Sequence, residues 1–89
     1  MTDRSPRRKI FKKNWPHAYA VYEINEIDNA DTFTAYGFDP NEDVFAKAVM
    51  ALDKSDEVTV TVSANVVTMN DAGLNDSRII IFVFGLTPP

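Results

Sequence analysis

The sequence contains no cysteine and a single histidine, and each scarcity excludes a class of site. Without cysteine there are no disulfides, no thiolate zinc ligands and no cysteine nucleophile. The one histidine, His17, would lack partners in a histidine-based metal site, so we predict no metal and no other cofactor. No apolar run approaches the ~18 residues of a transmembrane helix, and the basic N-terminus does not lead into the apolar stretch of a signal peptide. These absences predict no membrane association and a cytoplasmic location.

Charge is divided unevenly along the 89 residues, whose formal net charge is -4. Residues 1–17 carry six Lys or Arg against Asp3, a balance of +5, whereas the rest carries three against twelve acidic residues, a balance of -9. A basic segment followed by an acidic body is typical of proteins with charged partners. We therefore predict a basic, mobile N-terminal arm over residues 1–16 and a single domain over residues 17–87.

Residues 39–52 carry the strongest helical pattern in the chain. Asp39 precedes Pro40, and Glu42 stands three residues after Asp39, which is the spacing of a capping box. At 100° per residue the apolar side chains fall in one arc, formed by Val44, Phe45, Ala48, Val49, Ala51 and Leu52. The arc would pack on a sheet, so we predict that Val49→Asp unfolds the domain, because an unpaired carboxylate would enter the core.

Alternating apolar and polar residues predict strands on both sides of this helix. Strands are expected over 18–25 and 32–38, with the short Asx-rich segment between them closing an antiparallel hairpin. Residues 57–63 alternate valine with threonine or serine, and a strand pattern resumes at 66–69. The sequence leaves open whether 57–69 is one bent strand or two.

The most apolar strand is predicted over residues 78–84. Its continuous apolar run indicates burial on both faces, or one face on the core and the other on a partner. The resulting fold class is α+β: a two-layer domain with an antiparallel sheet of four or five strands and one helix packed on one face, in the order ββαββ(β).

No motif predicts catalysis. The sequence lacks a nucleophile elbow, a phosphate loop, a dinucleotide fingerprint and metal-ligand spacing. Adjacent carboxylates such as Glu42-Asp43 and Asp56-Glu57 do not share a face of a helix or a strand. We therefore predict a binding protein and not an enzyme.

The charge division suggests two alternative binding surfaces, one acidic and one basic. A third hypothesis requires no charged binding surface. An acidic surface would bind a protein that handles nucleic acid and compete with that nucleic acid, through Glu23, Glu26, Asp28, Asp31 and Asp43. The basic arm would instead grip nucleic acid directly, through Arg7, Arg8, Lys9, Lys12, Lys13 and Trp15. The third hypothesis is a structural module that forms a homodimer or larger oligomer through an exposed sheet edge.

The layout resembles that of the small phage-encoded anti-CRISPR proteins. The resemblance lies in the short, acidic, cysteine-free chain and in a hairpin that leads through Gly37-Phe38-Asp39-Pro40 into one helix. It includes no diagnostic motif, so no residue role is carried over. It implies a phage-encoded inhibitor in the host cytoplasm that binds a CRISPR effector protein or complex and blocks nucleic-acid recognition or nuclease recruitment.

Overall fold

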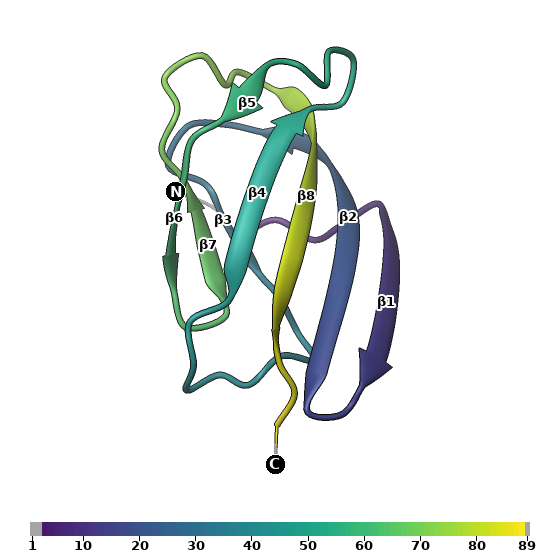
Figure 1. Ribbon diagram of the computed structural model, residues 1–89. Coiled ribbons are helices and arrows are strands. Elements are labelled where there is room, and N and C mark those ends of the chain that lie inside the picture. Colours follow the sequence, from purple (N-terminus) through teal and green to yellow (C-terminus); the bar gives the residue numbers. More distant parts are fainter. Residues whose placement is uncertain (1–2, 89) are drawn as a thin grey trace.

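The computed structural model describes residues 3–88 as two antiparallel β-sheets that pack face to face (Figure 1). The larger sheet has five strands, in the spatial order β1 (Arg8–Asn14), β2 (His17–Ile27), β8 (Ser77–Leu86), β4 (Phe45–Met50) and β5 (Glu57–Val58). The smaller sheet has three, in the order β3 (Thr32–Thr34), β7 (Val66–Met69) and β6 (Val60–Ser63). Residues 3–88 contain no helix that is long and apolar enough to cross a membrane.

The predicted helix over residues 39–52 is wrong, and with it the α+β class. Residues 45–50 form β4, which pairs with β8 from Phe45↔Phe84 to Met50↔Ile79. The cap signals serve a turn instead, because the Asp39 carboxylate accepts a hydrogen bond from the Asn41 backbone N–H at 2.9 Å. Residues 44–52 are apolar at every position except Lys47, so their pattern fits the two-residue period of a strand as well as the 3.6-residue period of a helix. Pairing with a distant strand therefore decides its conformation.

The alternation of β4 follows from that pairing. Ala48 is buried and Ala46 packs against the core, whereas Phe45 and Lys47 are exposed on the other face. Val49 shares the face of Phe45 and Lys47 because side chains alternate along a strand. The prediction that Val49→Asp unfolds the domain therefore loses its basis.

The strands predicted over 18–25 and 78–84 are confirmed, and both are longer than expected. The predicted hairpin between residues 18 and 38 is wrong, because β2 lies in the five-stranded sheet and β3 pairs with β7 in the other. Residues 57–63 are divided between β5 and β6, which lie in different sheets. Ala64 and Asn65 form the turn of a hairpin in which β6 pairs with β7, so residues 57–69 are not one bent strand.

The segment expected to be a mobile arm supplies an edge strand of the larger sheet. All seven residues of β1 pair with β2, from Arg8↔Glu23 to Asn14↔His17. The Phe11 ring packs edge-on against Phe38, with 5.4 Å between ring centroids. Gly37, at φ +96°, lies beside that ring, where an added Cβ would come within 3.0 Å of it. Residues 1 and 2 of the predicted arm lie outside the described residues.

The core lies between the two sheets. Alternate residues of β2 and β8 point inward, and these side chains meet the apolar side chains of the smaller sheet, as shown by the complete burial of Ala20, Ile24, Ile79, Ile81, Val83 and Val67. Phe33 and Phe38 fill the remaining space as large buried rings. The opposite side chains of β2 and β8 therefore form the outer surface of the larger sheet.

The Tyr22 hydroxyl is the one buried side-chain polar atom without a hydrogen-bond partner among residues 3–88. Its ring lies 4.5 Å from that of Phe33, centroid to centroid, in the core. Burial raises the pKa of this hydroxyl above its ordinary value of 10.0. The folded protein therefore retains the Tyr22 proton at a pH where the unfolded chain has lost it.

We expect Tyr22→Phe to raise the free energy of unfolding by about 1 kcal/mol, because it removes a buried polar group that makes no hydrogen bond. Wild-type stability should fall as pH rises above 10, since the unfolded state then binds fewer protons than the folded state. The variant should lose less stability over the same range. Urea denaturation from neutral pH to above pH 10 measures both effects. A variant less stable than wild type at neutral pH would show that the hydroxyl bonds an internal water.

Candidate functional site

The outer surface of the larger sheet, which we call the outer face, is the most distinctive surface of the protein. Antiparallel register aligns its side chains in rows across β1, β2, β8 and β4. The first, which we call the aromatic row, consists of Lys12, Tyr19, Phe84 and Phe45; the second consists of Ile10, Val21, Phe82 and Lys47; the third consists of Arg8, Glu23, Ile80 and Val49.

The outer face exposes large apolar side chains. Six of the nine large hydrophobic residues that are exposed in residues 3–88 lie on it, namely Ile10, Tyr19, Phe45, Phe82, Phe84 and Leu86. Phe45 is 56% exposed and Phe84 is 44% exposed. A contiguous patch of this kind on a small protein marks a binding surface, because water contact with it is unfavourable.

The rings at the centre of the outer face form two near-parallel pairs. The His17 and Phe84 ring centroids lie 5.7 Å apart with 19° between the planes. The Tyr19 and Phe82 centroids lie 6.2 Å apart with 21° between the planes. Each pair joins diagonal neighbours on β2 and β8, which lie within reach of aromatic side chains. The result is a platform of four rings that remains open to solvent.

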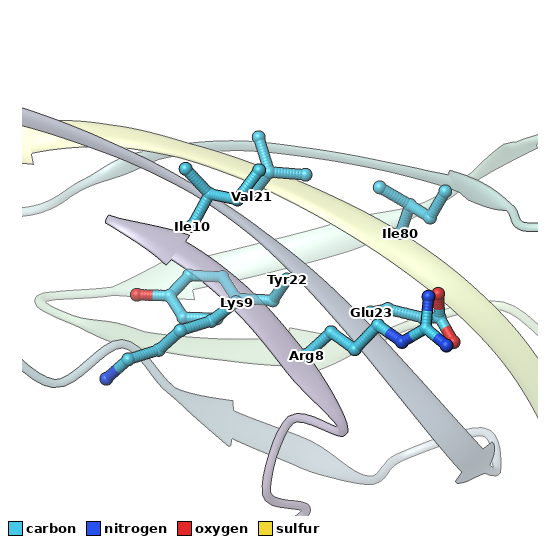
Figure 2. A pocket seen from close by; sticks show the side chains of 7 residues that line it. All are labelled: Arg8, Lys9, Ile10, Val21, Tyr22, Glu23 and Ile80. Atoms are coloured by element: carbon cyan, nitrogen blue, oxygen red, sulfur yellow. The ribbon is translucent and has the colours of Figure 1, made fainter. Parts of the chain in front are cut away.

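Two shallow hollows lie on the β1 side of this platform. The first, which we call the aliphatic hollow, measures about 360 Å³ and contains Ile10, Val21 and Ile80 in its lining. Figure 2 shows these three side chains on one side of the sheet, with Lys9 and the Tyr22 ring on the other. The second, which we call the hairpin hollow, measures about 350 Å³ and is lined by Lys12, Lys13, Asn14, His17, Ala18, Tyr19 and Phe84.

Basic residues are concentrated on the five strands that form the larger sheet. These strands hold six of the nine Lys and Arg residues but three of the thirteen acidic residues. The six basic residues are Arg8, Lys9, Lys12, Lys13, Lys47 and Arg78, and the three acidic residues are Glu23, Glu26 and Glu57. The remaining ten acidic residues lie outside the strands, because β3, β6 and β7 carry no charged residue. The charge division seen along the sequence thus becomes a division between the sheet and the loops.

The predicted basic contacts are distributed over both faces of β1. Arg8 and Lys12 share the outer face with Ile10, whereas Lys9 and Lys13 alternate to the opposite face of the strand. All four are exposed. The other two predicted contacts flank the strand: Trp15, in the turn between β1 and β2, is 66% exposed, and Arg7 lies before β1.

The predicted acidic contacts Glu23, Asp28 and Asp31 take part in contacts within the domain. Glu23 lies 3.5 Å from Arg7 Nη1 and 3.9 Å from Arg78 Nε. Asp31 is buried and accepts hydrogen bonds from Arg4 Nε at 3.0 Å and from the Asp28 backbone N–H at 2.9 Å. The bond to Asp31 raises the pKa of Arg4.

The other acidic contacts do not extend this group into one surface. Asp28 accepts a hydrogen bond from the Asp76 backbone N–H at 2.7 Å, and Asp43 accepts one from the Ala64 backbone N–H at 2.6 Å. Glu26 is exposed at an irregularity of β2 with φ 58°. Asp28 and Asp31 lie together beside Arg4, 3.7 and 3.0 Å from its guanidinium nitrogens, whereas Glu23 and Asp43 contact other parts of the fold. Four of the five carboxylates therefore hold loops or neighbouring side chains.

Sequence reasoning did not include the exposed rings of the platform among the site residues. The signal was present in residues 78–84, whose unbroken apolar run allowed one face on the core and the other on a partner. Phe82 and Phe84 supply that second face. Their partners Tyr19 and Phe45 become visible only once β8 is placed between β2 and β4 (Figure 1).

The outer face holds cations, aromatic rings and one imidazole, and it suits stacking and anion contacts. In the part of the chain that the structure describes, no group of three His, Asp or Glu side chains is placed to hold a metal ion. Comparisons of this chain with protein-family models, with curated proteins and with solved structures found no match.

Proposed function

We propose that this protein binds single-stranded nucleic acid on the outer face. The observation that carries the proposal is the in-register aromatic row, in which Tyr19, Phe84 and Phe45 lie side by side with Lys12 at the end of the row. Aromatic side chains stack on bases, and neighbouring cations contact the phosphates. This is the direct nucleic-acid hypothesis of the sequence, with the working surface moved from a mobile arm to a sheet.

The two kinds of contact are arranged for a strand that lies across the sheet. The rings occupy the central strands β2, β8 and β4, whereas Lys12 lies on the edge strand β1 and Lys47 lies on β4. Bases would stack on the rings, while the phosphates contact Lys12 at the end of the aromatic row and Lys47 in the neighbouring row. Lys47 Nζ lies 3.3 Å from Glu57 Oε2, but both side chains are more than half exposed, so this ion pair holds Lys47 only weakly.

The negative net charge does not oppose this arrangement at physiological salt. Charges interact strongly only within a Debye length, about 8 Å at 0.15 M ionic strength. Ten of the thirteen acidic residues lie outside the strands of both sheets. Alternation places Arg8, Lys12, Lys47 and Arg78 on the outer face together with Glu23 and Glu57. A phosphate on the outer face therefore meets mostly the local positive charge.

A protein is the competing occupant of the outer face. The inhibitor hypothesis, with a CRISPR effector complex as its target, needs a docking surface, and four of the five acidic residues named for it are engaged in contacts within the fold. The aromatic rings would serve that role if the partner were a protein or a second copy of this chain. Cations beside rings favour nucleic acid, and the other occupants are outcomes of the tests below.

Fluorescence anisotropy with a labelled oligothymidylate of about 15 nucleotides tests the proposal, since single-stranded binding modules cover ~4–16 nucleotides. The single strand should bind, and the same sequence annealed to its complement should bind more weakly because its bases are already stacked. Affinity should fall as salt rises from about 50 to about 200 mM. Absence of binding at the lower salt concentration would contradict the proposal.

Lys12→Gln and Lys47→Gln should each reduce the slope of log affinity against log salt by about 0.7, the value for one phosphate contact on a single strand. The matched control is Lys54→Gln, because Lys54 lies between β4 and β5 and bonds the Ala51 carbonyl oxygen at 3.0 Å. Its slope should equal that of wild type. Equal slopes in all three variants would place the phosphates elsewhere.

A further inference from the structure

The two hollows beside the platform differ in the chemistry of their linings. The aliphatic hollow combines branched aliphatic side chains with Arg8, Lys9 and Glu23, and the Glu23 carboxylate offsets part of the positive charge there. The hairpin hollow combines the rings of Tyr19 and Phe84 with Lys12 and with the side chains of Asn14 and His17, while Lys13 alternates to the opposite face of β1. The hairpin hollow differs in that its two aromatic rings, Tyr19 and Phe84, are exposed and that it contains no carboxylate, whereas the one ring of the aliphatic hollow, Tyr22, is buried.

The hairpin hollow is held in shape by the chain around it. Asn14 and His17 are paired where β1 turns into β2, and His17 is also paired with Leu86 of β8. The Thr87 backbone N–H donates to the Pro16 carbonyl oxygen at 2.8 Å, and the Thr87 hydroxyl donates to the same oxygen at 3.3 Å. Thr87 is only 4% exposed. The turn is thereby fixed to the end of β8. A site held in this way loses little freedom when a ligand binds.

These groups match the parts of one nucleotide. A base has two flat faces that stack on aromatic rings, and Tyr19 and Phe84 line the hollow as neighbours in the aromatic row. The Asn14 side-chain amide both donates and accepts hydrogen bonds, as the edge of a base requires. Lys12, on the outer face, supplies an ammonium group for the phosphate.

We infer that the hairpin hollow is a nucleotide subsite, which takes one base together with its phosphate. The inference rests on the proposed function, because it assigns one nucleotide of the bound strand to a particular place on the outer face. The remaining rings, Phe82 and Phe45, then serve neighbouring bases without hydrogen bonds to their edges. Recognition of a base edge is confined to the end of the sheet where β1 turns into β2.

Nuclear magnetic resonance titration of the full chain with adenosine monophosphate tests the subsite directly. The largest shifts should fall on the backbone amides of Asn14, His17 and Tyr19 and on the Asn14 side-chain amide. Inorganic phosphate alone should move the Lys12 amide but leave the Asn14 side chain unmoved. Identical shifts with both ligands would overturn the inference and leave only an anion site.

The double variant Asn14→Ala/His17→Ala links the subsite to strand binding. Both residues are exposed, so the melting temperature should stay at the wild-type value. Oligothymidylate affinity should fall about tenfold, a loss of the size expected for one base contact, and the adenosine monophosphate shifts should disappear. If the variant binds the oligonucleotide like wild type and the mononucleotide shifts lie elsewhere, the subsite is refuted while strand binding stands. If the mononucleotide shifts map to the hollow and no oligonucleotide binds, the subsite stands and the proposed function fails.

Discussion

Tyr19→Ala/Phe84→Ala should reduce the affinity for a single strand by at least about 30-fold, because stacking contributes ~1–3 kcal/mol per base. The two rings are direct neighbours in the aromatic row, and both are more than two-fifths exposed. Their removal exposes the backbone of β2 and β8 without opening the core, which lies on the other side of the sheet. The measurement is oligothymidylate anisotropy, with thermal unfolding to confirm that the variant is folded.

Two further variants make this experiment decisive. Tyr36→Ala removes a ring that is 71% exposed in the segment between β3 and β4, so it should leave affinity unchanged. Tyr19→Phe keeps the flat ring and removes only the hydroxyl, so most of the affinity should remain. Wild-type affinity in the double variant would exclude the aromatic row as the binding platform.

The oligomeric state of the same double variant separates nucleic acid from a second copy of the chain. Two copies joined through their outer faces would bury the rings, and the loss of Tyr19 and Phe84 would convert a dimer to a monomer. Sedimentation of wild type and variant shows whether this happens. If wild type is a dimer that does not bind oligothymidylate and the double variant is a monomer, the outer face is a homodimer interface and the proposed function is contradicted.

Ala48→Asp should abolish folding, whereas Val49→Asp should leave a cooperative melt within a few degrees of wild type. Ala48 is 1% exposed and packs in the core. A carboxylate there would be buried without a partner, which costs several kcal/mol, comparable to the whole stability of a small domain. Val49 lies on the outer face between Ile80 of β8 and Glu57 of β5, where a carboxylate can reach water.

This pair of variants distinguishes a strand from a helix at residues 45–50. In the helix expected from the sequence, positions 48 and 49 share the apolar arc, so both aspartates would unfold the protein. In β4 they point to opposite faces. Circular dichroism melts therefore decide between the two conformations, and loss of folding in Val49→Asp would contradict the pairing of β4 with β8.

Sequence reasoning located residues 18–25 because the two faces of that strand differ in polarity, and residues 78–84 because their apolar run is continuous. Residues 18–25 alternate clearly enough to identify Ala20, Tyr22 and Ile24 as one face, and all three are buried. Residues 44–52 contain only Lys47 as a polar interruption, so local pattern could not distinguish the periods of helix and strand. The decisive interaction, six residue pairs with β8, lies more than 25 residues away in sequence.

The candidate site escaped prediction for a related reason. Charge runs are visible in sequence, so residues such as Lys12 were named as contacts. The aromatic row depends on the register of β2, β8 and β4, which brings Tyr19, Phe84 and Phe45 side by side from three distant segments. The acidic residues were equally visible, but hydrogen bonds such as that from Arg4 to Asp31 engage them within the fold.

The position of β1 has a consequence for edge-to-edge pairing between copies of this protein. A sheet with an exposed aromatic face can assemble into fibrils if one of its edge strands can pair with a strand of another copy. Here one border is β1, with four cations in seven residues, and the other is β5, which is two residues long. Repulsion between the cations of two copies disfavours pairing at β1, and the short length of β5 leaves few backbone groups for pairing at the other edge. Lys12, which contacts a phosphate in our proposal, thus also belongs to the charged border that disfavours the addition of another strand.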